Sequence, residues 1–144
     1  MTRLLLDTSV LISVERGRRA PGTSLATVIP DEADVAIAAL TLAELTVGVE
    51  LASARHRAER AAFVDDLRRT VPTIPYDERV ADAHAVLLAS VRRAGRPRGA
   101  HDLIIAATAA AWDRTVVTGD ATAFDDLPGV RVLGLRAPDT GEGR

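Results

Sequence analysis

The stretch RLLLDTS, residues 3–9, joins a short apolar run to an acid and two hydroxyl residues. Three leucines between polar residues are typical of a short buried strand, and Thr8 or Ser9 can cap a helix that follows. In an open parallel α/β sheet, every strand delivers the chain to a helix at the same edge, and ligands bind at that edge. We therefore expect Asp7 to lie at the functional edge of such a sheet.

Strand and helix patterns alternate along the rest of the chain. Further strands are expected at residues 35–40, 73–76, 115–118 and 130–135. Further helices are expected to begin near residues 41, 56, 77, 100 and 123 and to end near residues 51, 71, 94, 112 and 127. This alternation predicts three layers, with a parallel sheet of about five strands and helices on both faces. Residues 1–137 are expected to form one domain, and residues 138–144 a loose tail.

Composition excludes several classes of chemistry. With 144 residues, 47% of them hydrophobic, the chain suffices for one core but not for two. It contains no cysteine, which excludes disulfides and thiolate nucleophiles. All 18 basic residues are arginine, so P-loop and Schiff-base lysines are excluded. No apolar stretch reaches the length of a membrane span, so we expect a soluble, cytoplasmic protein.

Four acidic residues fall where a strand ends or a helix begins, and we call them the four acids: Asp7, Glu44, Asp102 and Asp120. If they converge, two carboxylates roughly 4 Å apart repel by about 4 kcal/mol at an effective dielectric near 20. Such a group needs bound protons or a cation. Mg²⁺ and Mn²⁺ prefer oxygen ligands, and either ion can activate water for phosphodiester hydrolysis. The pattern therefore predicts a divalent metal site.

Each acid taken alone also has a structural interpretation. Acidic side chains are favoured at helix N-termini, where backbone N–H groups are free. Glu44 follows Thr41 at the spacing of a capping box, T-x-x-E, so capping explains it well. The histidines show no zinc-type spacing, which makes a zinc site improbable. Only the joint pattern of the four acids favours metal binding.

Four segments of the chain, taken in order, match the motifs of one family. They are residues 4–12, residues 43–45, residues 102–109 and residues 116–120 with the nearby Phe124. Residues 102–109, DLIIAATA, are similar to the motif D-x-x-I-A-A-T-A. In these segments the chain resembles PIN-domain ribonucleases, and within them the VapC-type toxins of toxin–antitoxin pairs. The resemblance covers nearly the whole chain and implies a PIN-like fold and a Mg²⁺- or Mn²⁺-dependent endoribonuclease.

The resemblance also implies roles for individual residues. It assigns catalysis and metal binding to the four acids. It makes Thr8, Ser9 and Thr118 hydroxyl partners that orient carboxylates or metal-bound water, although ordinary cap and strand-end hydrogen bonds explain them equally well. The family has one residue fewer between its last acid and the phenylalanine, so Asp125 competes with Asp120 for the fourth position.

Arginines near the acids are candidates for binding RNA phosphates, because four carboxylates would otherwise repel the substrate. One group precedes Asp102 and a second follows the first expected helix: Arg92, Arg93, Arg96 and Arg98, and then Arg16, Arg18 and Arg19. A solvated helix end is the alternative interpretation of both groups. The resemblance further implies a homodimer and a complex with a VapB-type antitoxin.

Two other functions stay open at this point. A phosphatase with an aspartyl nucleophile at Asp7 would need a second acid two residues later, where the chain has Ser9, and a lysine that the chain lacks. A non-catalytic α/β binding module on the same scaffold is also possible, because a fold alone does not fix a function. That reading would be favoured if any of the four acids faced away from the crevice.

Overall fold

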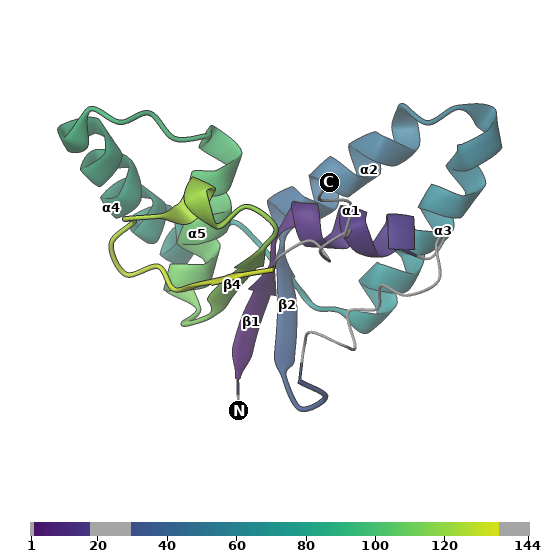
Figure 1. Ribbon diagram of the computed structural model, residues 1–144, viewed down its shortest axis with the longest axis horizontal. Coiled ribbons are helices and arrows are strands. Elements are labelled where there is room, and N and C mark those ends of the chain that lie inside the picture. Colours follow the sequence, from purple (N-terminus) through teal and green to yellow (C-terminus); the bar gives the residue numbers. More distant parts are fainter. Residues whose placement is uncertain (1, 18–29, 136–144) are drawn as a thin grey trace, which may run out of the picture.

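Parallel strands and the helices that join them build a three-layer α/β architecture in the computed structural model, which describes residues 2–17 and 30–135 (Figure 1). The described strands are β1 (Arg3–Leu6), β2 (Asp34–Ala38), β3 (Thr73–Ile74), β4 (Thr115–Thr118) and β5 (Val132–Gly134). The described helices are α1 (Thr8–Gly17), α2 (Ala39–Glu50), α3 (Ala54–Thr70), α4 (Glu78–Ala94), α5 (Ala100–Ala111) and the 3₁₀ helix η2 (Ala121–Phe124). The expected fold class is confirmed. No helix within these ranges has the length and apolar character needed to cross a membrane.

The five strands form one sheet in the order β3-β2-β1-β4-β5, and all neighbouring strands run parallel. The order reverses between β1 and β4, because later strands are added on both sides of β1. At such a switch point the chain leaves neighbouring strands toward opposite faces, and a crevice opens at their carboxyl ends. Asp7 directly follows β1, and Gly119 and Asp120 directly follow β4, so both acids lie at this crevice.

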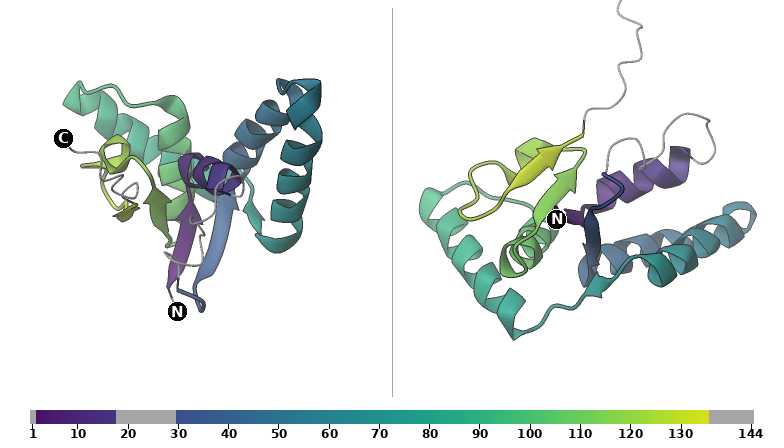
Figure 2. Two further views of the ribbon diagram at one scale, coloured as in Figure 1. Left: turned by 45° about the vertical axis from the view of Figure 1, so that its right-hand side comes forward. Right: turned by 90° about the horizontal axis from the view of Figure 1, so that it is seen from below.

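Apolar side chains cover both faces of the central strands. Leu5 and Val116 pack with α4 and α5 on one face, whereas Leu4, Leu6 and Val117 pack with α1, α2 and α3 on the other. The views in Figure 2 show these two groups of helices on opposite sides of the sheet. Successive residues of a strand point to opposite faces, so a strand buried on both faces reads as a continuous apolar run. This explains the three consecutive leucines of β1.

Two expected helix caps are wrong. Thr8 and Ser9 lie inside α1, and the backbone N–H of Thr8 donates instead to the carboxylate of Asp7 at 2.8 Å. Helix α2 begins at Ala39 rather than at Thr41, and no side chain caps it. The capping-box interpretation of Glu44 is therefore wrong, because β2 passes directly into the helix and places Thr41 in its first turn. Helix capping therefore does not explain the glutamate at position 44.

The segment after Asp120 differs from the helix expected at residues 123–127. It is a 3₁₀ helix at Ala121–Phe124, and Phe124 is buried in the core. A 3₁₀ turn is tighter than an α-helical turn, and here it joins Asp120 directly to the buried Phe124. Arg18, Arg19 and the expected tail at residues 138–144 lie outside the described residues.

Candidate active site

The Asp7 carboxylate accepts hydrogen bonds from three neighbours at the carboxyl end of β1. Its side chain is 7% exposed, and its Oδ1 accepts the Thr8 N–H at 2.8 Å. Its Oδ2 accepts the hydroxyls of Ser9 at 2.9 Å and Thr118 at 2.8 Å. Ser9 Oγ also accepts the N–H of Gly119 at 3.1 Å, which ties β1 to the end of β4. Because an ionised carboxylate can accept about four hydrogen bonds, Asp7 keeps capacity for one more ligand.

Glu44 approaches the same crevice from α2. Thr8 Oγ1 donates to Glu44 Oε1 at 3.1 Å and also contacts Thr41 Oγ1 at 3.2 Å. On the other side, His101 Nδ1 lies 3.6 Å from Glu44 Oε2. Sequence reasoning missed the contact of Thr41 with Thr8. The signal was available, because Thr41 and Glu44 are three residues apart and share one face of the helix.

Asp120 is linked to Asp7 through one hydroxyl group. The N–H of Asp120 donates to Thr118 Oγ1 at 3.0 Å, and that hydroxyl donates to Asp7 Oδ2. Thr122 Oγ1 donates to Asp120 Oδ1 at 2.6 Å, which fixes the carboxylate against the first turn of η2. Sequence reasoning missed Thr122 as well. A relay of hydroxyls therefore connects the ends of β1 and β4.

Asp102 lies in the first turn of α5, and its carboxyl is close enough to the other three acids to be affected by their charges. Burial raises the pKa of Asp102 above its ordinary value of 3.8, and the negative charges of the other three acids raise it further. His101 lowers this pKa in part. Among the described residues, no hydrogen bond reaches the Asp102 carboxylate. Burial and the neighbouring negative charges therefore disfavour the ionised form of Asp102.

Of Asp120 and Asp125, Asp120 is the one whose charge raises the pKa of Asp102. Both side chains are exposed, so exposure does not distinguish them. We therefore take Asp120 as the fourth acid of the cluster. Sequence reasoning also missed the role of Gly99, which precedes α5. A Cβ atom at Gly99 would lie only 2.8 Å from Asp102 Oδ2, so glycine leaves space for that carboxylate.

The donor set of the cluster fits a hard divalent cation. All four side chains offer carboxylate oxygens, and Asp7 and Asp102 keep free acceptor capacity. In residues 2–17 and 30–135, no three Asp, Glu or His side chains are already drawn together as a metal site. Mg²⁺ suits such spacing, because it takes one or two carboxylates directly and reaches others through retained waters. A cation would also relieve the repulsion that raises the pKa of Asp102.

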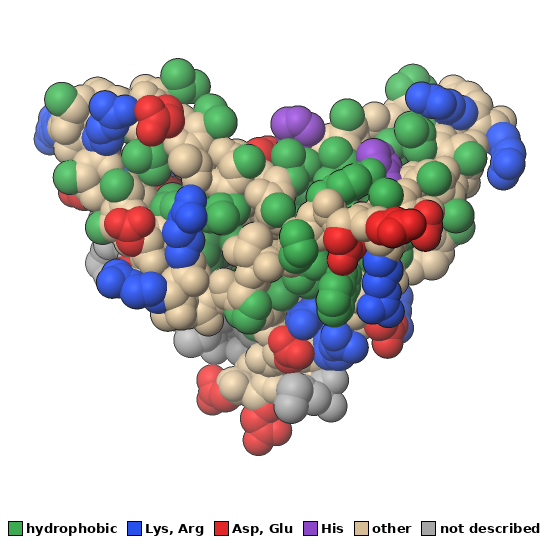
Figure 3. All heavy atoms as spheres, turned by 180° about the vertical axis from the view of Figure 1, so that it is seen from behind, with side chains coloured by type: hydrophobic (Ala, Val, Ile, Leu, Met, Phe, Trp, Pro, Cys, Tyr) green, Lys and Arg blue, Asp and Glu red, His purple; other side chains and the backbone are tan. Residues whose placement is uncertain are grey.

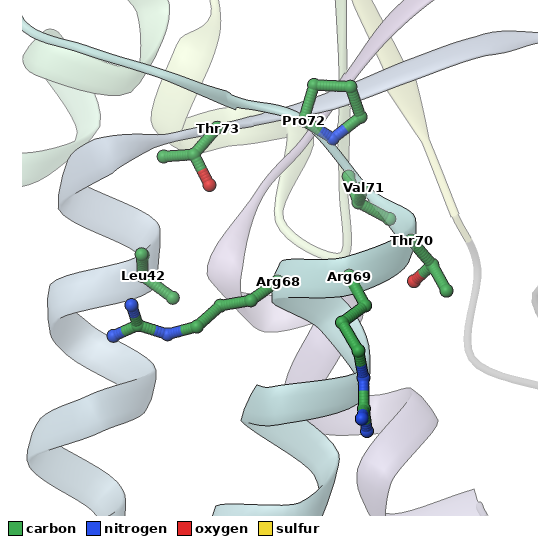
Figure 4. Close-up of a pocket in the computed structure, with 7 residues that line it drawn as sticks. All are labelled: Leu42, Arg68, Arg69, Thr70, Val71, Pro72 and Thr73. Atoms are coloured by element: carbon green, nitrogen blue, oxygen red, sulfur yellow. The ribbon is translucent and has the colours of Figure 1, made fainter.

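The surface is hollowed at the edge of the molecule that carries the cluster. Figure 3 shows a notch between two lobes, one formed by the α2–α3 hairpin and the other by α4 and α5. A separate pocket lies beside α2 and α3, where Arg68 extends toward α2 (Figure 4). It is lined by Leu42, Arg68, Arg69, Thr70, Val71, Pro72 and Thr73. This pocket contains no acid and is distinct from the cluster.

The arginines before Asp102 fall into two kinds. Arg92, Arg93 and Arg96 are exposed at the end of α4 and in the turn that follows. None of these three forms a hydrogen bond or ion pair with any of the described residues. Arg98 is half-buried, and its guanidinium donates to the backbone carbonyls of Thr122 at 2.9 Å and Asp125 at 2.6 Å.

Replacing Asp102 is expected to stabilise the metal-free protein. Because its pKa is raised by folding, the folded chain binds more protons than the unfolded chain between the ordinary and the raised pKa. Stability therefore falls as pH rises through that window, and the loss persists at neutral pH. Asp102→Asn removes this loss.

Solvent screening limits the gain from Asp102→Asn to about 1 kcal/mol, or about 2–4 °C in Tm for a domain of this size. Thermal unfolding in chelator at pH 7 measures the gain, and it should shrink as the pH falls through the raised pKa of Asp102, because the wild-type carboxyl is then protonated. A variant less stable than the wild type at pH 7 in chelator would contradict this description of the cluster.

Comparison with known proteins agrees with this geometry. A model of the PIN domain matches residues 4–130. Ribonuclease VapC5 of Mycobacterium tuberculosis is 36% identical over 132 residues, which cover 90% of this chain and 93% of the relative. Ribonuclease VapC4 of the same organism is 31% identical over 131 residues, covering 91% and 95%.

Solved structures give the same result. The crystal structure of VapBC-5 from Mycobacterium tuberculosis, a member of the VapBC family of toxin–antitoxin systems, is similar with a TM-score of 0.75 and 30% identity, covering 94% of this chain and 100% of that chain. VapBC2 of Rickettsia felis, solved with a fragment of promoter DNA, has a TM-score of 0.82 over 94% of this chain and 100% of that chain. At 19% identity this second similarity supports the fold alone.

Proposed function

This chain belongs to the PIN-domain family and is a VapC-type ribonuclease toxin of a type II toxin–antitoxin system, and from this premise we propose that it hydrolyses RNA with Mg²⁺ or Mn²⁺ held by the four acids. One observation carries the proposal. Three carboxylates from separate elements act on the pKa of Asp102. A cation bound between the acids would be attracted by all four carboxylates and would offset their mutual repulsion.

The residues of the cluster have distinct roles in this proposal. When bound, the cation supplies an activated water and neutralises charge on the phosphoryl group. Asp7 offers its remaining acceptor capacity, and the hydroxyls of Ser9 and Thr118 hold its orientation. Thr8 holds Glu44 in the same way. These hydrogen bonds fix the carboxylates before the substrate arrives, so less reorganisation is needed during the reaction.

RNA reaches the cluster only if its phosphates meet positive charge. Arg92, Arg93 and Arg96 are exposed at the end of α4 and in the turn that leads to α5, the helix that carries Asp102. We assign them to RNA phosphates, an interaction that weakens as salt concentration rises. We also propose that the protein acts in the cytoplasm, because its proposed substrate is cellular RNA.

The protein partner of the chain is a VapB-type antitoxin in this proposal, because the solved relative with 30% identity is itself a VapBC complex. Exposed apolar side chains offer contact surfaces of the kind that protein partners cover. They include Val47, Leu51 and Val86, which are 52%, 80% and 63% exposed. We also propose a homodimer, because a second copy of the chain can cover exposed apolar side chains in the same way.

The phosphatase alternative is weakened by the position of Ser9. That mechanism needs a second acid at this place, and the Ser9 hydroxyl donates to Asp7 Oδ2 instead. The alternative of a non-catalytic module predicts that purified protein binds RNA without cleaving it in any metal.

Removal of divalent metal is expected to abolish RNA cleavage. Purified protein is incubated with structured RNAs in Mg²⁺ or Mn²⁺, then with excess chelator, and finally with metal restored. Cleavage should fall to background in chelator and return with the metal, because the acids alone repel the phosphate that they must approach. Cleavage that continues in chelator would end the proposal, whereas RNA binding without cleavage would favour the non-catalytic module.

A further inference from the structure

Arg98 differs from the neighbouring arginines in what its guanidinium contacts, and we propose that it is a positioning residue for Asp120 rather than an RNA ligand. The inference rests on the proposed metal-dependent cleavage and adds a specific residue to it. Arg92, Arg93 and Arg96 extend from the same end of α4 and its turn without described partners. Arg98 is half-buried, and it contacts backbone more than twenty residues further along the chain.

The two contacts of Arg98 use its planar fork. Nη1 donates to the carbonyl of Thr122 at 2.9 Å, and Nη2 donates to the carbonyl of Asp125 at 2.6 Å. Thr122 lies within η2, and Asp125 directly follows it. A guanidinium presents several donors in a fixed geometry, whereas an ammonium acts as a compact point charge. Arg98 therefore holds η2 at two points that a lysine cannot span in the same way.

From η2 the connection continues to the cluster. Thr122, whose carbonyl accepts from Arg98, donates its own hydroxyl to Asp120 Oδ1 at 2.6 Å. Helix η2 has only four residues, so it gains little stability from its own hydrogen bonds. Burial of Phe124 anchors one side of this short helix, and the two hydrogen bonds from Arg98 add a clamp on its backbone beside Thr122.

The clamp also begins at the segment that carries Asp102. Arg98 is followed by Gly99, where an added Cβ atom would lie 2.8 Å from Asp102 Oδ2. One end of the Arg98 side chain is thus anchored beside Asp102, and the other end is bonded to the turn that orients Asp120. Loss of the clamp should change the spacing of these two acids, and with it the affinity for a divalent cation.

Three variants test the role of Arg98: Arg98→Lys, Arg98→Met and Thr122→Val. For each, kcat, KM and the salt dependence of KM are measured with Mn²⁺, and Mn²⁺ affinity is measured by calorimetry without RNA. We expect kcat to fall and the Kd for Mn²⁺ to rise by about tenfold, the lower end of what lost support of a metal ligand produces. KM and its salt dependence should stay unchanged. Lysine should not rescue the loss.

A double variant tests the connection itself. If Arg98 acts through Thr122, then Arg98→Met with Thr122→Val should lose no more activity than the stronger single variant, because coupled residues are non-additive. Arg131→Met is the matched control. Arg131 also joins two segments, through Asp113 at 2.7 Å, but at the opposite edge of the sheet, and its replacement should change none of the four quantities.

Two results would overturn the inference. Arg98→Lys with wild-type kcat and Mn²⁺ affinity would show that charge alone matters. A higher KM with a salt slope reduced by about 0.7–1 in Arg98→Met would assign Arg98 to an RNA phosphate. Failure of the proposed function looks different, because the wild type itself would then not cleave or would cleave in chelator. If the Arg98 variants fail to fold, Thr122→Val still tests the inference, because it removes only the hydroxyl that donates to Asp120.

Discussion

Asp7→Asn should lower kcat for RNA cleavage by about 10²- to 10³-fold, the range for loss of one preorganised electrostatic group. The amide removes a negative charge and one oxygen. The amide also brings in an NH₂ group, which donates hydrogen bonds. The carboxylate of Asp7 instead accepts hydrogen bonds from Thr8, Ser9 and Thr118. Either orientation of the amide leaves at least one of these donors facing an NH₂ group. The variant should therefore lose both metal affinity and the orientation of the site.

Single-turnover cleavage with saturating Mn²⁺ measures this loss. Asp113→Asn is the matched control, since it makes the same chemical change at an exposed acid before β4, at the other edge of the sheet. Asn also tolerates the positive φ of 52° at that position. Circular dichroism checks that both variants are folded. Asp7→Asn activity within tenfold of the wild type would remove Asp7 from the mechanism.

Arg114→Met should lower the free energy of unfolding by about 2–3 kcal/mol, which is about 4–12 °C in Tm. Arg114 is 8% exposed at the amino edge of the sheet. Its Nη1 donates to the carbonyls of Leu4 at 3.1 Å and Asp34 at 3.0 Å, and to the Asp34 carboxylate at 3.0 Å. Methionine fills the volume but donates none of these hydrogen bonds.

We place the loss near the lower part of the range for a broken buried pair, because Arg114 Nε is buried without a partner among the described residues. Denaturant unfolding in chelator measures it. Arg131→Met breaks an exposed pair and should cost about 1 kcal/mol or less. A loss below 1 kcal/mol in Arg114→Met would contradict the structural role of Arg114. Its kcat at low temperature should match the wild type, because the cluster lies at the opposite edge.

Local signals in the sequence were enough for most of the fold. The leucines of β1 predicted a short buried strand, and Asp7 was expected at its end. Helix α4 also begins and ends where its sequence predicts, because Asp77 accepts the N–H of Val80 and Gly95 ends the helix with φ of 65°. Such features depend on a few neighbouring residues, so a single sequence carries them.

The remainder depends on contacts between distant residues. T-x-x-E reads as a capping box whether or not the helix begins at Thr41, and the end of β2 at Ala38 decided otherwise. Arg98 looked like the other arginines of its turn, because its acceptors are 24 and 27 residues away. Arg114 bonds across 110 residues to Leu4. No local pattern predicts these pairings.

Diffraction from crystals grown with Mn²⁺ tests the central claim most directly, since the anomalous signal of Mn²⁺ locates the ion without reference to activity. We predict one anomalous peak or a close pair between the carboxylates of Asp7, Glu44, Asp102 and Asp120, and its loss in Asp102→Asn. No peak at a Mn²⁺ concentration that supports cleavage, or a peak away from these carboxylates, would contradict the claim.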